Sequence, residues 1–259
     1  MLSYSGYLWS ADISRDVRAG REDESVEFDG YLEISGSYIY NKMPIPGADT
    51  QIGTIGLGGH LRYKRFFIDA YAESYNQFQL GLNAYSGSSW SFDILAAVSE
   101  HGVDSELNRE LKLFTDRDAA SLLGARATGY LGSTIVQFEA LQDISDVHNG
   151  SLITATLAKQ WLFHNWNFHA LVGARYESAR SLDYQFGIDP DEATAVYPAY
   201  EAKSGTTFVS EAGLTYPLSE NFIFTSTFRW WELPSAVVGS PFVTNDSYVT
   251  FTNTITFVY

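Results

Sequence analysis

The last twelve residues, Tyr248 to Tyr259, have the sequence YVTFTNTITFVY and alternate between two kinds of side chain. The apolar set is Val249, Phe251, Ile255, Phe257 and Tyr259, and the opposite set is Tyr248, Thr250, Thr252, Thr254 and Thr256. Side chains of a β-strand point alternately to its two faces, so this pattern predicts a strand with one apolar and one polar face. A single strand of a soluble β-sandwich would show the same pattern.

The repetition of this alternation along the chain favours a membrane barrel over a soluble sandwich. Residues 221–232 place Phe224, Phe228 and Trp230 on one face and Thr225, Thr227 and Arg229 on the other. The aromatic-rich face continues through successive segments, while the opposite face collects Arg, Glu, Asp and Gln. A soluble barrel has the reverse polarity. We therefore expect the aromatic face, including Trp90, Phe251 and Phe257, to contact lipid.

Connection lengths indicate the orientation of this barrel. The pattern predicts about twelve strands, at 27–40, 54–63, 66–74, 77–85, 89–99, 119–131, 133–143, 151–162, 165–179, 206–217, 221–233 and 247–259. Tight connections alternate with longer ones at 100–118, 144–150, 180–205 and 234–246. Outer-membrane barrels have short periplasmic turns and longer extracellular loops. We therefore predict an all-β, antiparallel transmembrane β-barrel of the bacterial outer membrane with both termini at the periplasmic side.

Composition excludes several other classes of protein. No apolar run approaches the roughly 20 residues of a membrane-spanning helix, and a closed barrel is the other structure that satisfies the backbone inside a bilayer. The net charge of −15, with 16 Lys and Arg, argues against nucleic acid as a partner. The chain has no cysteine, which excludes a disulfide framework and a thiolate metal site.

The two ends of the chain are interpreted separately. Residues 1–26 are predicted to form an N-terminal tail or plug, and residues 27–259 the barrel. The start at Met1 is interpreted as a mature chain restarted with an initiator Met, so export is expected from the fold. At the other end, Phe251, Ile255, Phe257 and Tyr259 are similar to the terminal signal that the outer-membrane insertion machinery recognises. Outer-membrane lipid and lipopolysaccharide are the further expected partners.

Several short segments carry a family resemblance through their order and spacing. They are Arg65-Phe66-Phe67-Ile68, Thr115-Asp116-Arg117-Asp118, Asp143-Ile144-Ser145 with Asn149-Gly150, Tyr184-Gln185-Phe186-Gly187, residues 197–205, residues 214–218 and Ser240-Pro241-Phe242-Val243. Over residues 54–259 the chain resembles the MipA/OmpV family of outer-membrane proteins. The resemblance implies a scaffold that ties a murein-cleaving lytic transglycosylase to a peptidoglycan synthase, or a surface antigen and adhesin. Peptidoglycan-processing enzymes and host surface ligands are the partners that it implies.

Charged side chains gather on the predicted inward faces. The expected luminal charge network is Asp93, Arg126, Glu139, Arg175, Glu177, Glu211 and Arg229, joined by Asp29, Glu33, His60, Arg62, Asp69, Glu73 and His169. These groups either pair across the lumen and hold the barrel rigid, or line a charge-selective solute pathway. The expected function is an interaction or scaffold protein, as the family resemblance implies, with a narrow channel for small solutes or ions as the alternative. The sequence does not decide between them.

Candidate catalytic and metal-binding residues are few. Asp143 and His148 are the best acid–base pair, but no arrangement of Ser or Asp matches the known barrel hydrolases, so we predict no enzymatic activity and no cofactor. His164 and His169, five residues apart across a tight turn, are a weak metal pair. The run Asp189 to Glu192 is interpreted as solvated surface because it has no glycine-centred calcium loop, so no metal site is predicted.

Overall fold

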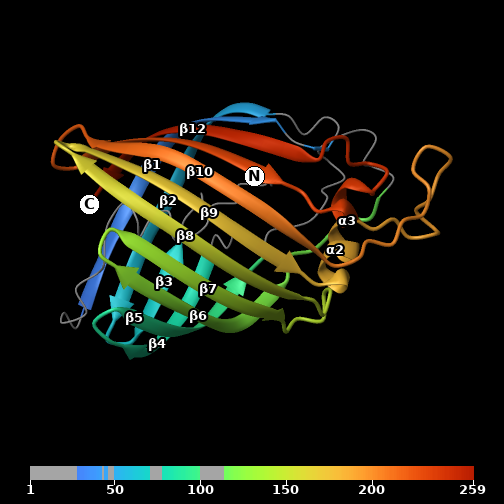
Figure 1. Ribbon diagram of the computed structural model, residues 1–259, viewed down its shortest axis with the longest axis horizontal. Coiled ribbons are helices and arrows are strands. Elements are labelled where there is room, and N and C mark those ends of the chain that lie inside the picture. The colour runs from blue at the N-terminus through green and yellow to red at the C-terminus, as the bar shows by residue number, and fades with distance from the viewer. Residues whose placement is uncertain (1–27, 43, 46–49, 71–77, 100–113) are drawn as a thin grey trace.

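The computed structural model describes residues 28–42, 44–45, 50–70, 78–99 and 114–259, which form a closed antiparallel barrel of twelve strands (Figure 1). The strands are β1 (Phe28–Lys42), β2 (Thr50–Tyr63), β3 (Phe66–Ala70), β4 (Phe78–Ser86), β5 (Trp90–Val98), β6 (Ser121–Leu131), β7 (Thr134–Asp143), β8 (Ser151–Phe163), β9 (Trp166–Glu177), β10 (Gly205–Pro217), β11 (Phe222–Glu232) and β12 (Ser247–Val258). Each predicted strand overlaps one of these, so the predicted fold class is confirmed. The predicted tail or plug at 1–26 lies outside the described residues.

The barrel closes where its first and last strands pair. β1 lies antiparallel to β12, with Ile34 opposite Phe257 and Lys42 opposite Val249. Two backbone hydrogen bonds between Leu32 and Tyr259, at 3.0 and 3.4 Å, extend this seam to the end of the chain. Each described strand therefore pairs with two neighbours. Because the number of strands is even, β1 begins and β12 ends on the same side of the barrel, the side of the short turns.

The outward face of the barrel is mainly apolar. Large hydrophobic side chains are exposed there, for example Ile55 at 81%, Leu57 at 74% and Phe228 at 49%. The residues that we expected to face lipid share this outward face: Trp90, Phe224, Phe228, Trp230, Phe251 and Phe257. Lys159 also points outward, with Nζ 5.8 Å from the centre of the Trp161 ring. Its aliphatic stem can cover apolar surface while its charge reaches water.

The inward face is only partly polar, which differs from the sequence-based expectation. One buried apolar cluster inside the wall contains Phe67, Leu95, Ala97, Ala120, Leu122, Leu141 and Leu152. A second consists of Ile135, Ala158 and Leu171. Leu95 and Leu122 have no exposed surface at all. The interior of a narrow barrel is filled by side chains from facing strands, so apolar residues pack there as they do in a protein core.

The short turns require backbone conformations that few residues adopt easily. Gly132, in the two-residue turn between β6 and β7, has a φ of 66°. Such turns need positive φ to match the twist of the flanking strands. Lys64 and His164 adopt a φ of 54° in the corresponding turns after β2 and β8. These hairpins fix the register of three strand pairs on this side of the barrel.

The longer connections on the opposite side contain two helices that the alternation did not predict. α2 (Ala179–Phe186) follows β9, and α3 (Ser235–Val238) follows β11. The predicted strand 165–179 was therefore too long, because β9 ends at Glu177 and the helix begins two residues later. Within the described part of the chain, neither helix has the length and apolar character needed to cross a membrane.

Candidate functional site

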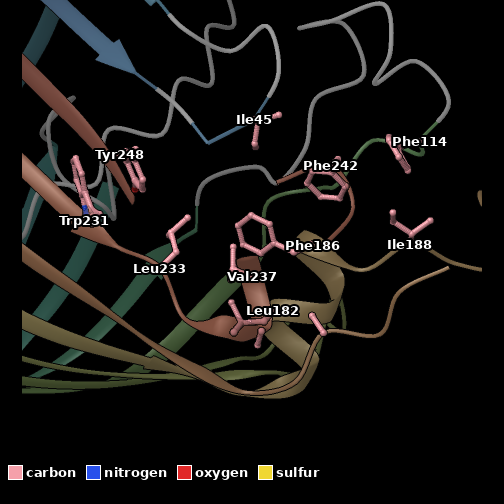
Figure 2. Packing of buried hydrophobic residues seen from close by; sticks show 12 residues of the cluster. Ile45, Phe114, Leu182, Phe186, Ile188, Trp231, Leu233, Val237, Phe242 and Tyr248 are labelled. Carbon is pink, nitrogen blue, oxygen red and sulfur yellow. The ribbon is translucent and has the colours of Figure 1, made fainter. Parts of the chain in front are cut away.

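The long connections pack together into an apolar cap on one end of the barrel, and Figure 2 shows its side chains pointing toward one another. The cap consists of Ile45, Phe114, Leu182, Phe186, Ile188, Ala202, Trp231, Leu233, Ala236, Val237, Phe242 and Tyr248. Trp231 and Tyr248 come from the inward faces of β11 and β12 and stack with their ring centres 4.4 Å apart. The cap is therefore continuous with the wall of the lumen.

The cap crosses the mouth of the barrel rather than covering one sector of its rim. Phe114 precedes β6 and Phe242 precedes β12, and their ring centres are 5.5 Å apart. In the closed strand order, β6 and β12 are six strands apart in either direction, so they stand on opposite walls. Phe242 also lies 6.3 Å from Phe186, the last residue of α2. Loops from opposite walls thus meet over the lumen.

Polar contacts tie the loops of the cap to one another. Arg117 Nη2 lies 3.0 Å from Glu192 Oε2, which joins the segment before β6 to the segment after α2. The Tyr184 hydroxyl accepts a hydrogen bond of 2.6 Å from the Asp118 backbone N–H. The other ties are Ala202 N–H to Asp183 Oδ1 at 2.7 Å, Ser240 Oγ to the Phe186 carbonyl at 2.7 Å, Tyr200 Oη to the Ala236 carbonyl at 2.8 Å and Thr244 Oγ1 to the Pro44 carbonyl at 2.9 Å.

The Glu192 carboxylate is stabilised in its charged form. Burial acts to raise its pKa, but hydrogen bonds from the backbone and side chain of Thr115 and from Arg117 outweigh burial, so the pKa of Glu192 is lowered. Glu192 belongs to the run Asp189 to Glu192 that we expected to be solvated surface. Its carboxylate instead holds two loops of the cap together, and this partner could not be recognised from the local sequence.

Asp143 and His148, the best acid–base candidate, form a structural turn between β7 and β8. The Asp143 carboxylate accepts hydrogen bonds from Ser145 Oγ and from the backbone N–H groups of Ser145, His148 and Asn149, all at 2.7 to 2.8 Å. His148 Nδ1 accepts the Gly150 N–H at 2.8 Å. Burial lowers the pKa of His148, although Asp143 and Glu177 oppose this effect. Both side chains are thus occupied in holding the turn.

The first of three charged clusters in the wall of the lumen is centred on Glu211 of β10. Arg229 Nε donates to Glu211 Oε2 at 2.6 Å, and His169 Nε2 lies 2.9 Å from Glu211 Oε1. The side chains of His169 and Glu211 have no exposed surface. Gly213 makes room for His169, because a Cβ at this position would lie 2.5 Å from the imidazole ring. The guanidinium of Arg229 also lies 5.4 Å from the centre of the Trp231 ring, at the base of the cap.

The second cluster lies on the opposite wall. Arg126 Nε lies 3.3 Å from Asp93 Oδ2, and its Nη1 donates to Gln79 Oε1 at 3.2 Å. Asn83 Nδ2 donates to the other oxygen of Asp93 at 2.8 Å. Glu139 stands directly opposite Arg126 in the register of β6 and β7. The cluster therefore spans four neighbouring strands.

The third cluster joins the lumen to the cap. Arg175 Nη2 lies 3.3 Å from Glu177 Oε1. The same oxygen accepts hydrogen bonds from Ser181 Oγ at 3.3 Å and from Gln185 Nε2 at 3.2 Å, both on α2. The end of β9 is thereby connected to the helix that follows it.

The structure does not place these pairs across the lumen, as we expected, but along its wall. Asp93 faces Arg126, Glu211 faces Arg229 and His60 faces Asp69 directly in register on neighbouring strands. Such partners have Cβ atoms about 5 Å apart, so their charged groups meet without crossing the lumen. Of the other inward candidates, Glu73 lies outside the described residues, and so does the side chain of Asp29.

The weak metal candidates do not converge. His164 is exposed in a short turn, whereas His169 is buried against Glu211 inside the barrel. Among the described residues, no group of three His, Cys, Asp or Glu side chains could hold a metal ion.

The residues of the cap were missed because they lie in segments that we interpreted only as long loops. Residues 180–205 and 234–246 contain Leu182, Phe186, Val237 and Phe242, an apolar content that is unusual for solvated loops. Several segments that carry the family resemblance also meet in the cap, including 115–118, 184–187, 197–205 and 240–243. The apolar content of these loops and the family segments within them are the signals from which a packed structure outside the strands could have been predicted.

A closed, twelve-stranded antiparallel barrel with an apolar outward face, short turns at one end and long loops at the other is an outer-membrane β-barrel protein. The protein is located in the bacterial outer membrane, with the short turns in the periplasm and the cap outside the cell. Residues 34–259 match the family described as MltA-interacting protein MipA, so the chain belongs to this family.

Several solved structures of outer-membrane proteins are similar to this chain in fold. A FadL homologue of Pseudomonas aeruginosa is 9% identical, with 98% of this chain and 95% of that chain covered and a TM-score of 0.46. OmpT of Vibrio cholerae, folded in vitro, is 7% identical over 90% of this chain and 97% of that chain, with a TM-score of 0.41. Salmonella typhi OmpF in complex with daunomycin is 9% identical, with 92% of this chain and 99% of that chain covered and a TM-score of 0.42. No curated protein matches the chain in sequence.

Proposed function

We propose that this outer-membrane barrel is sealed and acts as an interaction protein that holds a cell-wall-processing enzyme at its periplasmic side. The cap carries this proposal, because loops from opposite walls meet over the extracellular mouth through Phe114 and Phe242. A diffusion pore needs a continuous water path. Apolar packing across the mouth opposes such a path.

The interior of the barrel supports the same conclusion. Leu95, Leu122 and Leu141 pack inside the wall, and the Glu211 cluster is buried on the side opposite β5. Charges that are already paired within the wall are less available to bind and release a passing ion. A solute would have to displace both the cap and this packing, so the lumen serves stability rather than transport.

The partner is inferred from the family and from the periplasmic rim. The family description names MltA as the interacting protein. The family resemblance implies that such a partner is a murein-cleaving lytic transglycosylase. On the periplasmic side, Tyr63, Leu162 and Leu218 are exposed at 53%, 74% and 53%, and Tyr63 adjoins the basic pair Lys64 and Arg65. This mixture of apolar and cationic groups suits a protein partner.

Photo-crosslinking in living cells tests the proposal. A photoreactive amino acid at position 162 or 218 should give an adduct with a murein hydrolase, identified by mass spectrometry. The matched control is Val196, which is 75% exposed in the extracellular connection after α2. A murein hydrolase captured equally from position 196, or absent from both periplasmic positions, would contradict the proposal.

One observation favours a second candidate function, a gated narrow channel. A row of hydroxyl groups crosses four strands of the inward wall, with Thr215, Thr225, Thr254 and Ser37 directly opposite one another in turn. The Ser37 and Thr254 hydroxyls lie 2.9 Å apart. Such a wall can be wetted, so a solute could pass if the cap opened. Opening of the cap by mutation separates the two candidate functions.

A further inference from the structure

A short polar row interrupts the outward face of the barrel near the seam between β1 and β12. Ser226 of β11 lies directly opposite Asn253 of β12, and Asn253 lies directly opposite Tyr38 of β1. We call these three residues the Asn253 row. All three occupy outward positions, because Phe228 and Phe251, two residues away on β11 and β12, are exposed to the outside.

The Asn253 row lies within the apolar band and not at its edge. Asn253 is near the middle of β12 and is flanked on the same face by Phe251 and Ile255. Ser226 is flanked in the same way by Phe224 and Phe228. The polar atoms are therefore placed where hydrocarbon, and not water or headgroups, surrounds an isolated barrel.

The side chains of the row make no hydrogen bonds within the part of the chain that the structure describes. Tyr38 is 49% exposed, and Ser226 and Asn253 are half-buried, so all three remain accessible from outside the barrel. An acyl chain offers no hydrogen-bond partner, and leaving an amide unsatisfied in hydrocarbon is unfavourable. The row therefore requires a polar partner from another molecule.

The surface beside the row permits close approach of that molecule. Gly36 and Gly53 point outward on β1 and β2, and a Cβ built on either would have no atom within 4 Å. Gly53 lies directly opposite Tyr38, and Gly36 lies opposite Ile255. The two glycines thus leave open space beside Tyr38. Protruding side chains of a protein surface can fill this space.

We propose that the partner is a second copy of this chain, which packs its own Asn253 row against the first in a two-fold symmetric dimer within the membrane. An amide group contains both a donor and an acceptor, so two Asn253 side chains related by a two-fold axis satisfy each other. The hydroxyls of Ser226 and Tyr38 are self-complementary in the same sense. No charged side chain in the row opposes the approach of an identical surface.

The opposite side of the barrel provides a matched control. Six strands away, the middle of β6 presents Leu123, Ala125 and Ala127 to the outside. This surface has no polar side chain that needs a partner in the membrane. We therefore expect it to contact lipid and not a second copy of the chain.

The absence of cysteine makes a direct test possible, because Phe228→Cys, beside the row on β11, creates the single thiol of the chain and keeps Asn253. A short bifunctional thiol reagent applied to intact outer membranes should convert Phe228→Cys to a covalent dimer and leave Ala127→Cys monomeric. In mild detergent, analytical ultracentrifugation should show a dimer for the wild-type protein, Asn253→Gln and Ala127→Leu, and a monomer for Asn253→Leu. Heat-modifiable gel migration verifies that each variant is folded.

Three outcomes would overturn the proposed dimer. The first is a folded Phe228→Cys barrel that stays monomeric or is cross-linked no more than Ala127→Cys. The second is an unchanged dimer in Asn253→Leu. The third is a monomeric wild-type protein that loses bound lipopolysaccharide in Asn253→Leu, which would make a lipid the occupant of the row.

Discussion

Replacing Phe242 by Ala should open the cap. Phe242 is 2% exposed, and its ring contacts Phe114 from the opposite wall and Phe186 from α2. Truncation of a buried Phe to Ala lowers the free energy of unfolding by about 3–5 kcal/mol. We use the lower end of this range because the cap is bordered by solvent. About 3 kcal/mol shifts the equilibrium between closed and open cap by roughly a hundredfold. The barrel itself should stay folded, because its strand pairing does not involve residue 242.

Two readouts follow the opening of the cap. Limited proteolysis of whole cells should cleave the connections after α2 and α3 faster in Phe242→Ala than in the wild-type protein. Planar-bilayer recording of the same variant should show whether the lumen below the cap conducts. Phe138→Ala, which removes the same ring from the lipid-facing surface of β7, is the matched control. Wild-type protease resistance in Phe242→Ala would refute the assignment of the cap as the closure of the mouth.

Three further predictions address the lumen, the cap and the C-terminus. Glu211→Ala leaves buried Arg229 and His169 without their shared carboxylate and should lower the free energy of unfolding by about 3–5 kcal/mol in detergent, whereas exposed Glu232→Ala should not. The lowered pKa values of His148 and Glu192 mean that the unfolded loops bind more protons than the folded ones. The β7–β8 turn should therefore lose stability as pH falls below 6.5, and the cap, which Glu192 ties through Arg117, as pH falls below 4.5. A spin label at Val238 should become more mobile in the second range only. Deletion of 257–259 should block insertion by removing the proposed signal, and normal surface labelling of the truncated chain would refute that role.

The strands could be predicted from sequence because each is long enough to show the alternation by itself. Residues 247–258 are the best example, since every second side chain is apolar or aromatic except Ser247 and Asn253. The end of β9 could not be located in this way. Arg175 and Glu177 continue the alternation of the strand up to its last residue. The helix that follows begins at Ala179 with a similar mixture of polar and apolar residues, so the sequence does not mark the boundary.

The cap and the charge pairs depend on contacts between distant segments, which a local pattern does not contain. Phe114 and Phe242 are apolar residues in loops until the closed strand order brings their connections together over the mouth. Similarly, the inward faces identify Glu211 and Arg229 as luminal, but only the register makes them direct neighbours. The choice between pairing along the wall and pairing across the lumen follows from that register.

Conductance of the wild-type protein tests the sealed barrel most directly. The refolded full chain, with heat-modifiable migration verified, is added to a planar bilayer at neutral pH, where the cap is closed. We expect insertion without reproducible conductance steps, and we expect steps to appear only in variants such as Phe242→Ala if the lumen can be wetted. Uniform, reproducible ion-conducting steps from the wild-type protein would contradict the sealed barrel and make the narrow channel its function.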